Sequence, residues 1–139
     1  MATTQATIKL TSSDIMDSAI NVQYSNDLTI AGASTGITET TGLARRKFAS
    51  TSKVDLITFD NEVITADKSA KVYIKNTNDD AGTPLSTQYV QILINSQEIG
   101  RLYGGDWMFM PYSGGSGEDI EVKPSTTDVV NLEYMVFFE

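Results

Sequence analysis

The chain of 139 residues contains no cysteine and no histidine. Without cysteine it has no disulfide framework, no thiol nucleophile and no cysteine-ligated zinc site. Without histidine the Ser-His-Asp and Cys-His catalytic systems are excluded, as is the commonest general base at neutral pH. The sequence therefore predicts a protein that is not an enzyme, with no catalytic residue, no metal and no cofactor.

Long apolar runs are also lacking. The longest, such as Met135–Phe138, are far too short to span a bilayer. The segment Met1–Thr7 has neither the basic nor the apolar region of a secretory signal, so we expect synthesis in a cytoplasm and no membrane partner. The length suits one domain that buries its own core. We predict a single domain over residues 1–139, with residues 1–10 as an extended N-terminal arm.

Basic side chains are scarce in the second half of the chain. Residues 76–139 contain only Arg101 and Lys123 against ten acidic side chains, so the whole net charge of −8 arises there. An acidic surface repels phosphate backbones, and we expect no nucleic-acid partner. The one basic cluster, Arg45-Arg46-Lys47, is either a solvated strand edge or loop, or a docking site for an acidic protein.

Strand-forming residues dominate what the chain does contain. Thr and Ser are abundant, the usual helix formers are scattered, and apolar residues recur with period two. This pattern predicts an all-β fold, an antiparallel β-sandwich of jelly-roll or immunoglobulin-like strand order. The clearest strand is 130–138, in which Val130, Leu132, Tyr134, Val136 and Phe138 alternate with Asn131, Glu133, Met135 and Phe137.

Further strands follow from shorter patterns. In the second half, Val72 with Ile74 and Val90 with Ile92 each mark a buried face. We also expect strands near 6–10, 20–24, 28–30, 45–50, 54–59, 63–64, 98–103, 107–110 and 120–122. Ser13–Ser18 favours a short helical turn. The small, polar stretch Gly32–Gly42 indicates a loop or an extended arm. Asn95-Ser96 and Gly104-Gly105 are expected to turn the chain, the latter as a two-residue hairpin.

Two groups of oxygen-bearing side chains resemble calcium ligands. Asn76, Asn78 and Asp80 have the spacing of the first three ligands of an EF-hand loop, but the glycine and the bidentate glutamate that must follow are missing. An Asx-rich loop explains the pattern better. The acids of Glu118–Glu121 would alternate between strand faces, so we expect a solvated rim there.

The aromatic side chains allow two interpretations. Tyr103, Trp107, Phe109 and Tyr112 either belong to a core or interface, or form a platform on which a sugar stacks. Phe137 and the strand around Trp107 are apolar on faces that would otherwise be solvated. Such strands are covered either by another subunit or by a second layer of the same chain.

Four stretches of the second half share a further pattern. They are Val72–Thr77, Tyr89–Ile92, Ile99–Pro111 and Leu132–Glu139. They combine a strand followed by Lys-Asn-Thr, a glycine turn into an aromatic strand that ends in proline, and an aromatic C-terminal strand. In these features the chain resembles small virion structural proteins of tailed bacteriophages, cyanophages among them. Residues 1–69 have no counterpart in the resemblance.

The resemblance implies a capsid decoration (cement) protein located in the virion. Its expected partners are the major capsid protein or other virion proteins, and further copies of itself, with a trimer favoured. The alternatives are a tail or neck adaptor and a module that binds host glycans. The candidate interaction residues are Arg45, Arg46, Lys47, Tyr103, Trp107, Phe109, Tyr112 and Phe137.

Overall fold

The computed structural model describes residues 3–15, 19–30, 33–59, 69–80, 83–84, 88–113 and 117–139, and all its described elements are β-strands. The chain divides into two compact units. The N-terminal unit comprises residues 1–39 with Glu139, and the sandwich unit comprises residues 40–138.

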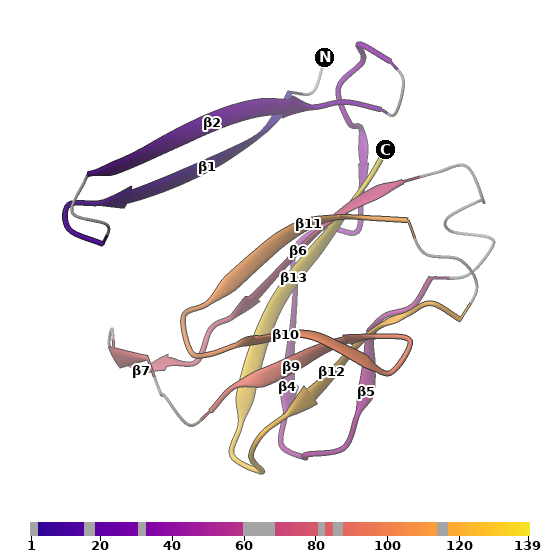
Figure 1. The fold of residues 1–139 in the computed structure, drawn as a ribbon. Coiled ribbons are helices and arrows are strands. Elements are labelled where there is room, and N and C mark those ends of the chain that lie inside the picture. The colour runs from indigo at the N-terminus through magenta and orange to yellow at the C-terminus, as the bar shows by residue number, and fades with distance from the viewer. Residues whose placement is uncertain are drawn as a thin grey trace. The chain divides into compact units, whose positions relative to one another are not determined.

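The sandwich unit consists of two antiparallel sheets (Figure 1). One sheet has the order β10 (Gln97–Leu102), β9 (Val90–Ile94), β12 (Ile120–Pro124) and β5 (Val54–Ile57). The other has the order β11 (Trp107–Tyr112), β6 (Ala70–Asn76) and β13 (Val130–Phe138), with β3 (Glu39–Thr40) and β4 (Ala44–Phe48) both beside β13. The predicted all-β sandwich is therefore confirmed.

The strand order identifies a jelly roll. Along the chain, the connections from β4 to β13 cross between the two sheets at every step except that from β9 to β10. Eight strands wound in this way are the double Greek key of a jelly roll, which decides between the two predicted strand orders. A small ribbon of β7 (Asp79–Asp80) and β8 (Thr83–Pro84) lies between β6 and β9 in the chain.

Within the described part of the sandwich sheets, β9 and β10 form a hairpin that turns at Asn95-Ser96, as predicted. Both residues have positive φ, 49° and 62°. This is the geometry of a two-residue type I′ turn, whose twist matches that of the flanking strands. Asparagine is one of the few residues that tolerate it.

The prediction of a hairpin at Gly104-Gly105 is wrong. β10 pairs with β9 and β11 pairs with β6, so the turn carries the chain from one sheet to the other. The Asp106 N–H donates to the Tyr103 carbonyl (2.9 Å), and Gly105 at φ 89° occupies the position of a type II turn that needs positive φ. The glycines thus specify a tight turn but not the sheet that the next strand joins.

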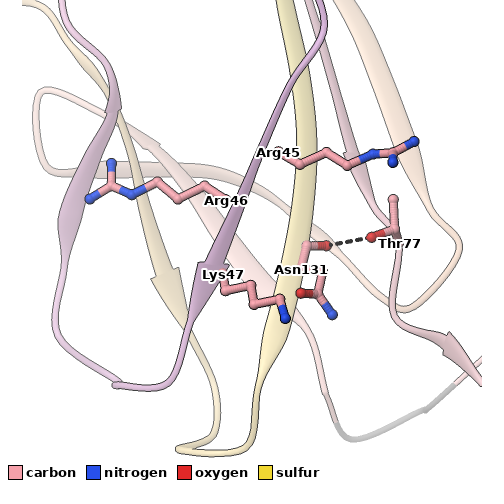
Figure 2. Close-up of a pocket in the computed structure, with 5 residues that line it drawn as sticks. All are labelled: Arg45, Arg46, Lys47, Thr77 and Asn131. Atoms are coloured by element: carbon pink, nitrogen blue, oxygen red, sulfur yellow. Dashed lines mark hydrogen bonds between the residues drawn. The ribbon is translucent and has the colours of Figure 1, made fainter.

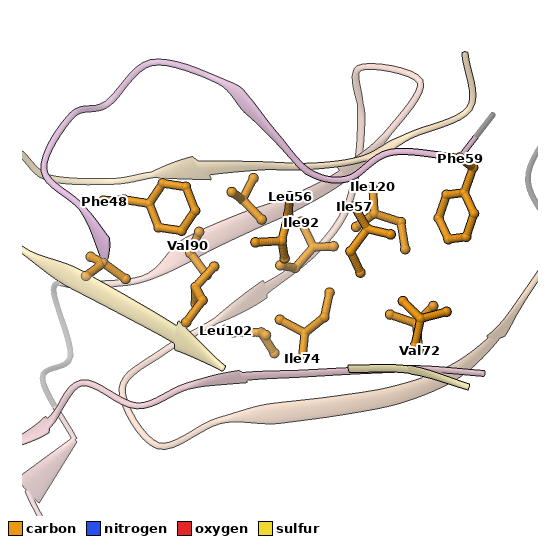
Figure 3. Close-up of a cluster of buried hydrophobic side chains, with 14 of the residues drawn as sticks. Phe48, Leu56, Ile57, Phe59, Val72, Ile74, Val90, Ile92, Leu102 and Ile120 are labelled. Carbon is orange, nitrogen blue, oxygen red and sulfur yellow. The ribbon is translucent and has the colours of Figure 1, made fainter. Parts of the chain in front are cut away.

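The core lies between the two sheets (Figure 3). The predicted alternation holds in β6 and β13, whose inward side chains include the fully buried Val72, Ile74, Val130 and Leu132. The buried cluster consists of Phe48, Leu56, Ile57, Phe59, Ala70, Val72, Ile74, Val90, Ile92, Leu102, Ile120, Val122, Val130, Leu132 and Val136.

The N-terminal unit contains a ribbon of two antiparallel strands, β1 (Thr4–Ser12) and β2 (Ile20–Leu28). β1 includes most of the segment expected as an arm. Of the helical turn expected at Ser13–Ser18, residues 13–15 form a bend in which the Ile15 N–H donates to Ser12 Oγ (3.3 Å), and the rest lies outside the described residues. The strand expected near 63–64 also lies outside them.

Candidate functional site

The ribbon of β1 and β2 is amphipathic. Its register places Ile8 opposite Tyr24 and Leu10 opposite Val22 on one face. Polar pairs line the other face, where Thr7 and Ser25 are among the residues joined by side-chain hydrogen bonds. Ile8, Leu10 and Tyr24 are 44%, 52% and 72% exposed. A two-stranded ribbon is marginally stable by itself, and an open apolar face is typical of a surface that binds a partner.

The sandwich unit presents a second apolar surface, on the outside of the β11–β6–β13–β4 sheet. The cross-strand register arranges its outward residues in three rows. Trp107, Lys75, Glu133 and Arg45 form the first row, Phe109, Tyr73 and Met135 the second, and Pro111, Lys71 and Phe137 the third. We call Trp107, Phe109, Pro111, Tyr73, Met135 and Phe137 the outer aromatic face.

The outer aromatic face is partly exposed, and two of its rings are in contact. Trp107 is 55% and Phe109 36% exposed. The Phe109 and Phe137 rings meet edge to face, with centroids 6.3 Å apart. Trp107 on β11 and Phe137 on β13, both marked in the sequence as apolar where a solvated face was expected, thus lie on one surface of the sandwich unit.

Glu133 organises the charged side chains on this face. Its carboxylate accepts hydrogen bonds from Arg45 Nε (2.9 Å) and from the Tyr73 hydroxyl (3.3 Å). Partial burial, and then the nearby Glu133 charge, raise the pKa of Tyr73 above its ordinary value. The Arg45 side chain is largely exposed, so the ion pair adds little stability and mainly orients the groups.

The basic triplet does not form one cluster (Figure 2). Because β4 is a strand, Arg45 and Lys47 point to the outside of the sheet while Arg46 points the other way. Arg46 donates to the Asp55 carbonyl (2.7 Å) and lies over the Phe48 ring. The triplet, Thr77 and Asn131 line an open depression of about 310 Å³, and the three cations are not aimed at one ligand.

Two of the four candidate aromatic residues, Tyr103 and Tyr112, lie outside the outer aromatic face. The Tyr103 ring stacks against Tyr89, with centroids 5.3 Å apart. Tyr112 packs on Phe59 (4.8 Å) at the rim of the core, where burial raises its pKa. Only Trp107 and Phe109 of the predicted four remain together. The separation of Tyr112 from Trp107 was predictable from the sequence. The two residues are an odd number of positions apart, so their side chains point to opposite faces of one strand.

Asn76 is a structural residue whose role the sequence interpretation missed. Its side chain is fully buried; Nδ2 donates to the Leu102 carbonyl (3.0 Å) and Oδ1 accepts from the Asn78 N–H (3.0 Å). Asn78 Oδ1 in turn accepts from the Asn131 N–H (3.0 Å). The spaced asparagines therefore tie backbone segments together. The sequence did indicate that Asn76 is buried, since it continues the inward alternation of Val72 and Ile74.

The expected solvated rim at Glu118–Glu121 is wrong for Glu121, which is buried. Its carboxylate pairs with Lys53 and accepts the Ser96 N–H (2.7 Å), fixing the β9–β10 turn. Hydrogen bonds, first from Lys53 and then from Ser96, hold the pKa of Glu121 below its ordinary value despite the burial. Asp119 instead accepts the Phe59 N–H (2.8 Å). Within the described residues, no three acidic side chains gather as a metal site.

The Glu121 contacts predict acid-sensitive stability. A pKa lowered by folding stabilises the protein above the unfolded pKa of about 4.3, and the contribution is lost as pH falls below it. We expect Glu121→Gln to reduce the difference in urea midpoint between about pH 6 and about pH 3. The control is Glu39→Gln, the same change at an exposed position of β3, which should leave that difference close to wild type. An unchanged pH dependence in Glu121→Gln would contradict the assignment.

No family model, no curated protein and no solved structure matches this chain. In the part of the chain that the structure describes, no helix is long and apolar enough to cross a membrane. The function must therefore be argued from the two apolar surfaces and from the resemblance of the second half.

Proposed function

We propose that this protein is a virion structural protein that decorates and stabilises the capsid of a tailed phage through protein–protein contacts, without catalytic activity. The observation that carries the proposal is the open apolar face of the β1–β2 ribbon. Its partners are the major capsid protein or other virion proteins, together with further copies of the chain.

The ribbon suits attachment to a large protein surface. Fully burying one large apolar side chain is worth about 1.5–3 kcal/mol, so covering Ile8, Leu10 and Tyr24 contributes several kcal/mol to binding. Repeated copies on one particle add avidity, because each attached subunit also holds its neighbours in place. A ribbon that binds in this way gains a covering for its exposed apolar face, which stabilises a two-stranded ribbon.

The sandwich supplies a rigid body for the same role. Its core needs neither disulfide nor metal, since the chain has no cysteine and the buried cluster is entirely apolar. Jelly rolls build viral capsid proteins and also lectins. The fold is compatible with the proposal but does not select it.

The ribbon can be tested with a pair of charge variants. Ile8→Asp with Leu10→Asp places two carboxylates on the apolar face, and Thr7→Asp with Thr11→Asp places the same two charges on the polar face. On particles that lack the protein, we expect the first variant to lose at least about tenfold in occupancy, because burying unpaired charge is costly. The second should bind nearly as well as wild type.

The readout is the amount of protein that sediments with the particles, measured on gels. Thermal unfolding of both variants should retain the wild-type transition of the sandwich. If the two variants occupied the particles equally, the apolar face of the ribbon would not be part of the contact with the capsid. Copy number separates head from tail: hundreds of copies per virion support decoration, whereas a dozen or fewer support a tail or neck adaptor.

A glycan-binding module is the second candidate, favoured by the exposure of Trp107 on the outer aromatic face. Aromatic rings in such positions can stack on sugars. Under this reading Trp107→Ala abolishes adsorption to host cells while capsid occupancy is unchanged. Loss of self-association in the same variant would instead identify the tryptophan as an interface residue.

A further inference from the structure

The free edges of the sandwich differ in how they are protected. Sheet edges that carry charges or bulges resist pairing with other strands. Among the described strands, the outermost are β10 and β5 in one sheet, and β11 on one side and β3 with β4 on the other side of the second sheet. β10 carries Glu98, Arg101 and a register shift, β5 carries Asp55 and also pairs with a register shift, and β4 carries the basic triplet.

β11 is the exception. Its sequence, Trp-Met-Phe-Met-Pro-Tyr, contains no charged residue, and among the described strands it pairs only with β6. Trp107 and Phe109 on its outward side are exposed. An apolar edge strand that carries no charge and pairs without a register shift is a template for another strand.

The main-chain groups that face this edge follow from the ladder with β6. The Asn76 N–H donates to the Asp106 carbonyl (2.9 Å), so residue 106 directs its main-chain groups toward β6. Because these directions alternate along an antiparallel strand, Met108, Met110 and Tyr112 also face β6. Trp107, Phe109 and Pro111 therefore direct their main-chain groups to the free edge, where the missing N–H of proline costs no hydrogen bond within the sheet.

We propose that β11 pairs antiparallel with β11 of a second copy, centred on Phe109, in a two-fold symmetric dimer. The pairing joins the β11–β6–β13–β4 sheets of the two copies into one continuous sheet. It also merges the two outer aromatic faces.

The centre follows from the side-chain pattern. A two-fold axis perpendicular to the sheet keeps outward residues opposite outward residues, so it passes midway between one residue of β11 and the same residue of the second copy. Centring on Phe109 places each Trp107 opposite Pro111 of the second copy, and Met108 opposite Met110. A centre at Met110 would pair Trp107 with a residue beyond β11, and a centre at Met108 would do the same for Pro111 and Tyr112.

The strand is complementary to itself in charge. No charged side chain lies on β11, and the nearest cations on this face, Lys75 and Lys71, are on β6. Across the dimer the nearest pair is separated by about three strand spacings, or about 14 Å. This exceeds the screening length of about 8 Å at physiological salt, so the cations oppose pairing only weakly.

The size of the contact sets the expected affinity. The paired strip is about 17 Å long and one sheet thick, which places the interface below the roughly 1,200 Å² of standard complexes. About four main-chain hydrogen bonds form across it, two at Phe109 and one at each Trp107 N–H. We therefore expect a reversible dimer with a dissociation constant in the micromolar range.

Sedimentation equilibrium of the full chain tests the dimer. At about 100 µM, well above such a dissociation constant, wild type should have twice the monomer mass of 15.1 kDa. Phe109→Lys should be monomeric at the same concentration, because it places a charge on the bare edge. Ile99→Lys is the matched control: it lies on the protected edge strand β10, is similarly exposed, and should remain dimeric.

Disulfide trapping tests the register independently of folding effects. The chain has no cysteine of its own. Residues directly opposite in a hydrogen-bonded pair have Cα atoms about 5.5 Å apart, within the range of a disulfide. Under mild oxidation Phe109→Cys should form a covalent dimer, whereas Trp107→Cys, which faces Pro111, and Ile99→Cys should not.

Each of the following results would overturn the proposal: a monomer at about 100 µM, which exceeds the expected dissociation constant, a dimer that survives Phe109→Lys, or equal trapping at positions 99 and 109. A mass of three chains, the trimer favoured by the resemblance, would also overturn it. The dimer does not depend on the proposed capsid role, because its measurements use the purified chain alone.

Discussion

Asn76→Ala is expected to lower the free energy of unfolding of the sandwich by about 3 kcal/mol. The side chain is fully buried at the end of β6. It joins that strand to the Leu102 carbonyl at the end of β10 and to the Asn78 N–H in the following segment. Removing the amide takes a hydrogen-bond partner from the buried Leu102 carbonyl and from the partly buried Asn78 N–H, and a buried polar group left unpaired costs about 1–3 kcal/mol.

Urea unfolding followed by tryptophan fluorescence measures this loss, because Trp107 lies on β11 in the same unit. The control is Asn21→Ala, the same truncation at an exposed position of the ribbon. This variant should change the free energy of unfolding of the sandwich by no more than about 0.5 kcal/mol. If Asn76→Ala were as mild as this control, the buried amide would not be the link between the strand ends.

Leu132→Ala is expected to destabilise the sandwich by about 3–4 kcal/mol. Leu132 is fully buried in the middle of the core, on a strand that pairs with both β6 and β4. Truncation removes apolar burial and leaves a cavity that strands held on both sides cannot easily close.

Leu43→Ala provides the matched comparison for that loss. Leu43 is 56% exposed just before β4, so the same chemical change should cost less than about 0.5 kcal/mol. Calorimetry of both variants gives the comparison directly. Similar losses in the two variants would mean that the two sheets do not enclose Leu132 in solution.

Much of the fold was predictable from local pattern. The alternation in β6 and β13 correctly separated inward Val72 and Leu132 from outward Lys75 and Glu133, because successive side chains of a strand point to opposite faces. The turn at Asn95-Ser96 was predictable because its residue types suit positive φ. Strand ends were less accurate: the strand expected at 45–50 ends at Phe48.

The candidate surfaces were predictable only in part. Trp107, Phe109 and Phe137 were marked by being apolar where polar residues were expected, and they share the outer aromatic face. Tyr103 and Arg46 were grouped with neighbours in the sequence from which the fold separates them. Sequence adjacency indicates little about adjacency in space when consecutive strands belong to different sheets.

The missing cysteine and histidine and the period-two pattern determined by themselves that the chain builds a β-sandwich without thiol or imidazole chemistry. They could do so because residue chemistry and strand alternation are local properties. The tertiary structure alone decided that the strands form a jelly roll, that Glu121 is buried and paired with Lys53, and that the uncharged β11 is an edge strand among the described strands. These features depend on which distant segments pair, and that is determined by the packing of the whole core.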